Sequence, residues 1–179
     1  RQAWLRPGAR GTVLIVHGLG EHSGRYAHVA EALNAVGWDV AAYDHRGHGR
    51  SGGARGALPS DTALLEDLAA VLDAERAAAH GNRQGKLVLL GHSMGGAVAA
   101  RFVAEGTQAT PAAWHRKVDA LVLSSPALAA NLRAFDRLLL AVMPHLAPNL
   151  AVANGLKPQW VSRDAKTVAD GIRYAHAKG

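Results

Sequence analysis

Short apolar segments alternate with helical patterns between residues 12 and 124 of this 179-residue chain, and this alternation limits its fold most. Each segment is almost continuously hydrophobic and ends at a turn-forming residue, which is typical of strands buried on both faces. The four segments cover residues 12–17, 38–43, 86–91 and 120–124. Strands joined by helices form right-handed βαβ units, so we expect an α/β fold with a mostly parallel sheet and helices on both faces.

Hydrophobic residues at helical spacing predict three helices within this region. They cover residues 26–36, 61–79 and 94–105. Asp61 follows a Pro-Ser pair and is the expected N-cap of the second helix. Trp4 and Leu5 indicate a further edge strand, and Asp119 is expected to have a structural role at the start of the last strand.

The alternation ends at residue 126, and the rest of the chain has a helical pattern interrupted by prolines. Residues 127–146 are amphipathic, with an apolar side formed by Leu132, Phe135, Leu138, Leu139 and Val142. We therefore expect a core over residues 1–126 and a helical cap inserted over residues 127–179.

Composition excludes several classes of function. The chain has no cysteine, so it forms no disulfide, zinc finger or thiol nucleophile. No apolar run approaches the roughly 20 residues that a membrane-spanning helix needs. The net charge is +6, but Lys and Arg are scattered among acids and aromatic residues make up only 5%, so we expect no nucleic-acid binding.

Two histidines, His45 and His48, are three residues apart in a glycine-rich loop. No third ligand accompanies them, so we expect no metal site and no organic cofactor. Asp44 and Arg46 are expected to hold this loop in place through side-chain hydrogen bonds.

A G-x-S-x-G pentapeptide at residues 91–95 joins a predicted strand to a predicted helix. This strand–turn–helix context is typical of a nucleophile elbow, in which a strained turn exposes the serine hydroxyl. Ser93 is the expected nucleophile, and Gly91 and Gly95 are the glycines that make room for the turn. His92 is adjacent in sequence, and its side chain should leave the turn in another direction.

Two backbone N–H groups are the expected donors to the oxyanion of a tetrahedral intermediate. One belongs to Met94, which follows the nucleophile, and the other to Leu19 in the Gly-Leu-Gly loop after the first buried strand.

Three motifs give the chain a family resemblance. Residues 17–26 (HGLGEHSGRY), 43–51 (YDHRGHGRS) and 91–96 (GHSMGG) occur in this order, followed by LSSPA at 123–127. They resemble the monoacylglycerol lipase and lysophospholipase branch of the α/β-hydrolases, whose motifs are shared with serine aminopeptidase-like proteins. The resemblance implies a lid at residues 127–153 that lines an acyl-chain tunnel, and a cytoplasmic protein with transient contact to a membrane surface through the cap.

The acid and base of the catalytic triad are missing from the expected places. In hydrolases of this fold they follow the serine in the chain, and the family's acid motif has no counterpart here. Asp164, Asp170 and His176 are the late candidates, but they lie in the predicted cap and not at the end of a strand. We therefore expect the triad Asp and His to lie outside this sequence, in a hydrolase of roughly 250–300 residues that also extends before Arg1.

Three functional hypotheses remain open. The first is a serine carboxylester hydrolase that acts on monoacylglycerols, lysophospholipids or similar lipid esters through an acyl-enzyme on Ser93. The second is an inert fragment or pseudoenzyme of the same fold, because a serine without a base is a weak nucleophile. The third is an aminopeptidase, which requires an acidic subsite for a free amino terminus.

Overall fold

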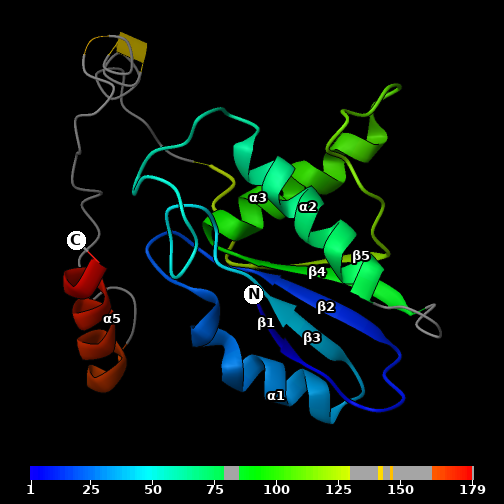
Figure 1. The fold of residues 1–179 in the computed structure, drawn as a ribbon, viewed down its shortest axis with the longest axis horizontal. Helices are drawn as coiled ribbons and strands as arrows, with labels where there is room; N and C mark the ends of the chain where they lie inside the picture. Colours follow the sequence, from blue (N-terminus) through cyan, green and yellow to red (C-terminus); the bar gives the residue numbers. More distant parts are fainter. Residues whose placement is uncertain (79–84, 130–140, 143–145, 147–162, 179) are drawn as a thin grey trace. The chain divides into compact units, whose positions relative to one another are not determined.

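The computed structural model describes residues 1–78, 85–129, 141–142, 146 and 163–178 (Figure 1). Its contacts divide the chain into two compact units, Arg1–Ala130 and Asn131–Gly179. The extent of a core at residues 1–126 and a cap at residues 127–179 stays a prediction.

The first unit contains a five-stranded sheet with the order β1-β3-β2-β4-β5. Its strands are β1 (Gln2–Trp4), β2 (Gly11–Val16), β3 (Asp39–Ala42), β4 (Lys86–His92) and β5 (Ala120–Ser124). Only β1 is antiparallel to its neighbour, with Ala3 opposite Ala41, and the other three pairings are parallel. The predicted parallel sheet is confirmed, and so is the edge strand indicated near Trp4.

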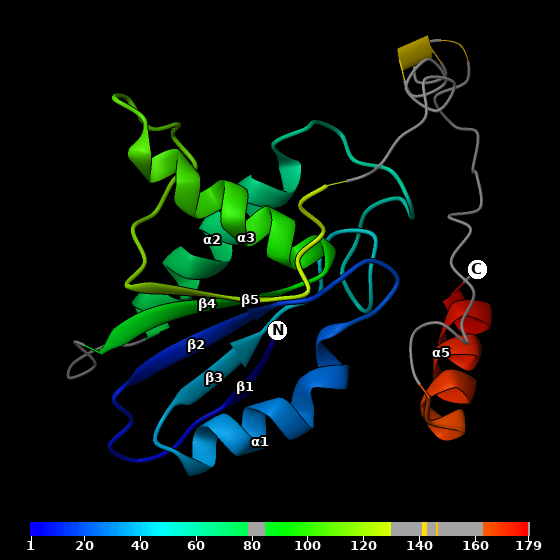
Figure 2. The same cartoon turned by 180° about the vertical axis from the view of Figure 1, so that it is seen from behind.

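Helices cover both faces of this sheet, as predicted (Figures 1 and 2). α1 (Ala27–Ala35) lies on one face, and α2 (Ala63–Ala78) and α3 (Met94–Ala104) lie on the other. Short 3-10 turns, Ser23–Tyr26 and Glu105–Thr107, precede α1 and follow α3.

Alternate residues of β2 supply both hydrophobic layers. Leu14 and Val16 pack with α2 and α3, where Phe102 is fully buried, while Val13 and Ile15 pack with α1. Because successive strand side chains point to opposite faces, a continuously apolar strand needs a cover on each side.

The expected N-cap of α2 is wrong by one residue. The helix begins at Ala63, and the carbonyl of Thr62 accepts the Glu66 N–H at 3.0 Å, so Thr62 and not Asp61 occupies the N-cap position. Asp61 instead forms a 3.5 Å ion pair with Arg101 of α3.

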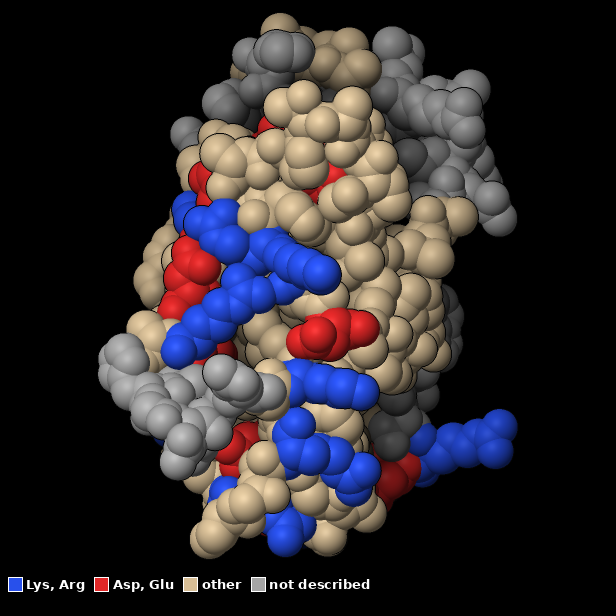
Figure 3. Space-filling view, turned by 90° about the vertical axis from the view of Figure 1, so that its right-hand side faces the viewer, with Lys and Arg blue, Asp and Glu red and all other residues tan. Residues whose placement is uncertain are grey.

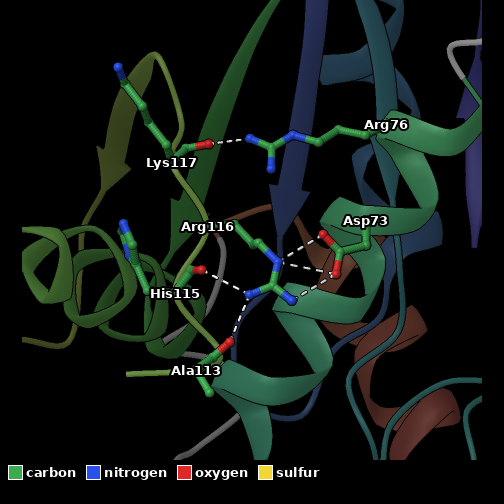
Figure 4. Close-up of polar contacts among 6 residues, drawn as sticks. All are labelled: Asp73, Arg76, Ala113, His115, Arg116 and Lys117. Atoms are coloured by element: carbon green, nitrogen blue, oxygen red, sulfur yellow. Dashed lines mark hydrogen bonds and ion pairs between the residues drawn. The ribbon is translucent and has the colours of Figure 1, made fainter. Parts of the chain in front are cut away.

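Side chains of α2 hold the segment that leads into β5 (Figure 4). The Arg116 guanidinium donates to both carboxylate oxygens of Asp73, at 2.9 and 3.1 Å from Nε, and to the carbonyl oxygens of Ala113 and His115. Arg76 donates to the carbonyl of Lys117. These contacts fix the chain direction before the last described strand.

Asp119 has the structural role that its sequence position indicates. Its carboxylate accepts the Leu87 N–H at 2.7 Å, and its own N–H donates to the Leu87 carbonyl at 2.8 Å. These two bonds join Leu87 of β4 to Asp119, the residue just before β5, and so set the register in which Val88 pairs with Ala120.

Acidic side chains interrupt the Lys and Arg side chains on the face shown in Figure 3. Ion pairs of the described residues include Arg1 with Glu75, Arg46 with Asp67 and Arg116 with Asp73. On this face, the positively charged side chains are therefore interspersed with negatively charged ones.

The second unit is described chiefly through α5 (Ala165–Lys178). Asp164 caps this helix, since its carboxylate accepts the Lys166 N–H at 3.1 Å and the Thr167 hydroxyl at 2.7 Å. Across the described ranges, no helix combines the length and apolarity needed to cross a membrane.

The predicted helix at residues 127–146 does not begin at residue 127. Residues 127–129 are not helical. The Ala127 N–H donates to the Ser93 carbonyl at 2.9 Å, and Ser125 just before it has a positive φ of 43°. Residues 141–142 and 146 are helical, and the rest of that prediction, with most of its apolar side and most of the proposed lid, falls outside the described residues.

Candidate active site

Ser93 occupies a strained turn between β4 and α3. Its φ of 52° and ψ of −120° lie outside the regions that residues with a side chain prefer, a cost of about 1–3 kcal/mol. The turn is held by the Ser93 N–H, which donates to the Ser124 carbonyl at 3.1 Å, and by the Ser93 carbonyl, which accepts the Ala97 N–H at 3.2 Å. The strand–turn–helix geometry of a nucleophile elbow is therefore present.

Close packing requires glycine on both sides of this turn. A Cβ atom on Gly91 would lie 2.7 Å from the Gly95 carbonyl oxygen, and one on Gly95 would lie 2.1 Å from the Val16 carbonyl oxygen. Both obstructing atoms belong to the backbone and cannot rotate away. The glycines thus let α3 start directly against the end of β2.

The loop after β2 approaches Ser93 closely. A Cβ on Gly18 would lie 3.1 Å from the Ser93 Cβ, so this loop passes beside the serine. Leu19 is the next residue and is 46% exposed. Met94 is the first residue of α3, where a backbone N–H has no partner in the helix ladder. The role of the Leu19 and Met94 N–H groups as oxyanion donors stays a prediction.

A pair of buried histidines links the ends of β2 and β3. The His17 Nε2 accepts the His45 N–H at 3.0 Å, so the proton of the His17 ring lies on Nδ1, which donates to the Gly18 carbonyl at 2.7 Å. The His45 Nε2–H donates to the His17 carbonyl at 3.1 Å. The sequence drew attention to His45 only as half of a histidine pair with His48, and sequence reasoning missed its partner His17.

Acid is expected to destabilise the protein through this histidine pair. Burial, with a smaller effect from His17, lowers the pKa of His45 to about 3, and burial also lowers the pKa of His17. Because the unfolded chain binds a proton on His45 near pH 6.5 and the folded chain binds it only near pH 3, stability is complete above pH 6.5. It falls by up to about 1.4 kcal/mol for each pH unit between these two values, and His17 acts in the same direction.

Urea unfolding between pH 7 and pH 4.5 measures this slope. His45→Gln, which keeps an N–H donor but does not titrate, should reduce the slope, and His28→Gln on the exposed side of α1 should not. Equal slopes for the wild type and His45→Gln would contradict a neutral buried His45.

Asp44 and Arg46 hold the loop after β3, as predicted. The Asp44 carboxylate accepts the N–H groups of Ser23 at 2.8 Å and Arg50 at 2.9 Å. Burial alone would raise the pKa of Asp44, but these hydrogen bonds outweigh it and lower the pKa to about 2. Arg46 donates two hydrogen bonds to the carboxylate of Asp67 on α2.

No histidine is placed as a base for Ser93 among the described residues. His92 points toward β5, where its Nδ1 lies 3.1 Å from both the carbonyl and the hydroxyl oxygen of Ser124. In the described part of the chain, no hydrogen bond reaches the Ser93 hydroxyl.

The late candidates have other contacts. Asp164 caps α5, Asp170 forms an ion pair with Arg173, and the side chain of His176 lies outside the described residues. Within the ranges that the structure describes, no group of three His, Cys, Asp or Glu side chains is arranged to hold a metal ion.

A cavity of about 310 Å³ lies over the α1 side of the sheet. Its apolar lining comes from Val29, Leu90 and Val122, and its polar lining includes Glu21, Arg25 and His92. A cavity of this size is at the lower end of the range for small-molecule sites.

The sequence matches the Hydrolase_4 family, described as serine aminopeptidase S33, over residues 7–174. The chain belongs to this family. It is 39% identical over 163 residues to a monoacylglycerol lipase of Mycolicibacterium smegmatis, covering 89% of this chain and 54% of that protein. Human monoglyceride lipase is 34% identical over 136 residues, which cover 75% of this chain and 43% of that enzyme.

Solved structures show the same fold. The monoacylglycerol lipase of Paleococcus ferrophilus superimposes with a TM-score of 0.69 at 32% identity, covering 99% of this chain and 71% of that one. A carboxyl esterase of Bacillus coagulans reaches a TM-score of 0.71 at 23% identity, covering 96% and 59%. The predicted monoacylglycerol lipase branch of the α/β-hydrolases is confirmed, and the chain spans about half the length of the curated relatives it matches.

Proposed function

We propose that this protein is a serine carboxylester hydrolase that acts on monoacylglycerols or lysophospholipid-like esters through Ser93. The observation that carries the proposal is the strained turn at Ser93, with a φ of 52°, against which the Gly18 loop packs. A serine held in such a turn, beside a loop and a helix start that offer N–H groups, is suited to acyl transfer.

The reaction proceeds in two steps. The Ser93 Oγ forms a bond to the ester carbonyl carbon and loses its proton to a base, while the carbonyl oxygen takes the negative charge and accepts hydrogen bonds from the Leu19 and Met94 N–H groups. The intermediate then releases the alcohol with a proton, and water hydrolyses the acyl-enzyme. The triad Asp and His are not among the residues that the structure places beside Ser93.

The substrate class rests on the relatives and on the cavity. The two sequence relatives above are named for lipase activity on monoacylglycerols or monoglycerides. The cavity beside α1 combines apolar side chains with polar ones that include Arg25 and His92, which suits an ester that carries a hydroxylated head group. The cap at residues 127–179 would cover the acyl chain and make transient contact with a membrane surface.

Aminopeptidase activity is the second candidate, because the matching family is described as serine aminopeptidase. The two are separated by comparing hydrolysis of a monoacylglycerol, a lysophospholipid and an aminoacyl p-nitroanilide by the purified protein. Turnover of the lipid esters but not of the anilide supports our proposal. Turnover of the anilide alone would contradict our proposal and support aminopeptidase activity. A folded protein that cleaves none of the three substrates supports the inert alternative.

A further inference from the structure

Glu21 is an acidic side chain bonded to the loop that passes Ser93, and it is largely buried. Only 12% of the side chain is exposed. Its Oε1 accepts the Gly18 N–H at 2.5 Å and the Tyr26 hydroxyl at 2.8 Å, and its Oε2 lies 3.9 Å from the Arg25 guanidinium. A short bond from a backbone N–H to a carboxylate is among the stronger hydrogen bonds in proteins.

Gly18 is held on its other side by His17. The His17 Nδ1–H donates to the Gly18 carbonyl at 2.7 Å, so both polar groups of Gly18 have a side-chain partner. No peptide bond among the described residues is cis, and in a trans peptide the N–H points opposite to the carbonyl. Fixing the Gly18 carbonyl therefore also fixes the direction of the Leu19 N–H.

We propose that Glu21 is a positioning residue for acylation of Ser93: with His17 it clamps Gly18 and so aims the Leu19 N–H at the oxyanion. This inference rests on the proposed function, because it concerns the oxyanion donor of the same serine. The charge of Glu21 is balanced by Arg25 and by the two hydrogen bonds that its carboxylate accepts from the Gly18 N–H and the Tyr26 hydroxyl. The carboxylate can therefore lie near the developing oxyanion without opposing it strongly.

Three variants of the whole protein test the clamp. Glu21→Ala removes the acceptor of the Gly18 N–H, whereas Glu21→Gln keeps a carbonyl oxygen for it and removes only the charge. Glu31→Ala on the exposed surface of α1 is the control. The readouts are the second-order rate constant for fluorophosphonate labelling of Ser93, kcat and KM for a p-nitrophenyl ester and for a glyceryl ester, and hydrogen exchange of the Gly18 and Leu19 amides by NMR.

Glu21→Ala should slow labelling and lower kcat by about tenfold to a hundredfold with little change in KM, because a loosened donor loses part of its effect on the oxyanion. Glu21→Gln should stay within about threefold of the wild type, and Glu31→Ala should not differ from it. Exchange of the Gly18 amide should accelerate in Glu21→Ala only.

Two results would overturn the inference. One is an unchanged exchange rate of the Gly18 amide in Glu21→Ala. The other is an equal loss of kcat/KM in both Glu21 variants that comes only from a raised KM for glyceryl esters, because that pattern is expected of a side chain that contacts the substrate. If wild-type Ser93 is not labelled, the proposed function fails by itself, and the exchange data still decide whether Glu21 holds Gly18.

Discussion

Ser93→Ala is expected to lower kcat for ester hydrolysis by at least about 10³-fold, because it removes the atom that forms the acyl-enzyme. Loss of the nucleophile in a serine hydrolase costs up to about 10⁶-fold, and the remaining catalysis comes from oxyanion donors and substrate binding. The same substitution should leave the melting temperature nearly unchanged, because alanine adopts the φ of 52° at a cost similar to that of serine.

Initial rates with a p-nitrophenyl ester and a monoacylglycerol measure this effect. Ser60→Ala, at an exposed position before α2, controls for loss of a serine hydroxyl elsewhere. If Ser93→Ala keeps more than about a tenth of the wild-type rate, Ser93 is not the nucleophile.

Gly95→Ala is expected to destabilise the fold and the elbow together. The new methyl group would lie 2.1 Å from the Val16 carbonyl oxygen and 2.3 Å from the His17 carbonyl oxygen, so α3 must move away from β2. Overpacking against backbone that cannot rotate away should cost about 3 kcal/mol or more, equivalent to a fall in melting temperature of roughly 6–12 °C.

Gly52→Ala is the matched control, because a Cβ at Gly52 meets no atom within 4 Å. The melting temperatures of both variants and of the wild type are measured by thermal unfolding followed by circular dichroism. A Gly95→Ala protein that melts within about 2 °C of the wild type would show that the β2–α3 contact is looser than described.

Local pattern was enough to predict the parallel strands. The predicted bounds of β2, β3, β4 and β5 differ from the observed ones by one residue or less at each end. β2, β3 and β4 are mostly buried, as expected, but the expectation of burial on both faces is wrong for β5, which is largely exposed. The turn at Ser93 was equally predictable, because glycines on both sides of a serine between a strand and a helix allow few other geometries.

Contacts between distant segments could not be predicted in this way. The His17–His45 bond joins residues 28 positions apart, and neither histidine carries a local signal of its partner. The Ala127 N–H likewise bonds to a residue far from it in sequence, since it donates to the carbonyl of Ser93.

The hydrogen bond between the Glu21 carboxylate and the Gly18 N–H joins residues only three positions apart, yet no sequence pattern indicated it. Its importance depends on the approach of Gly18 to Ser93, which comes from the parallel pairing of β2 with β4. The functional role of such a short-range hydrogen bond can be inferred only once the order of the strands in the sheet is known.

Covalent capture of Ser93 is the most direct test of its role as nucleophile. The folded protein is treated with a fluorophosphonate probe, digested and analysed by tandem mass spectrometry, with heat-denatured protein as the control. We predict an adduct on Ser93 in the folded protein and none in the denatured sample. A folded protein that carries no adduct on Ser93 would contradict the hydrolase proposal and favour an inert member of the family.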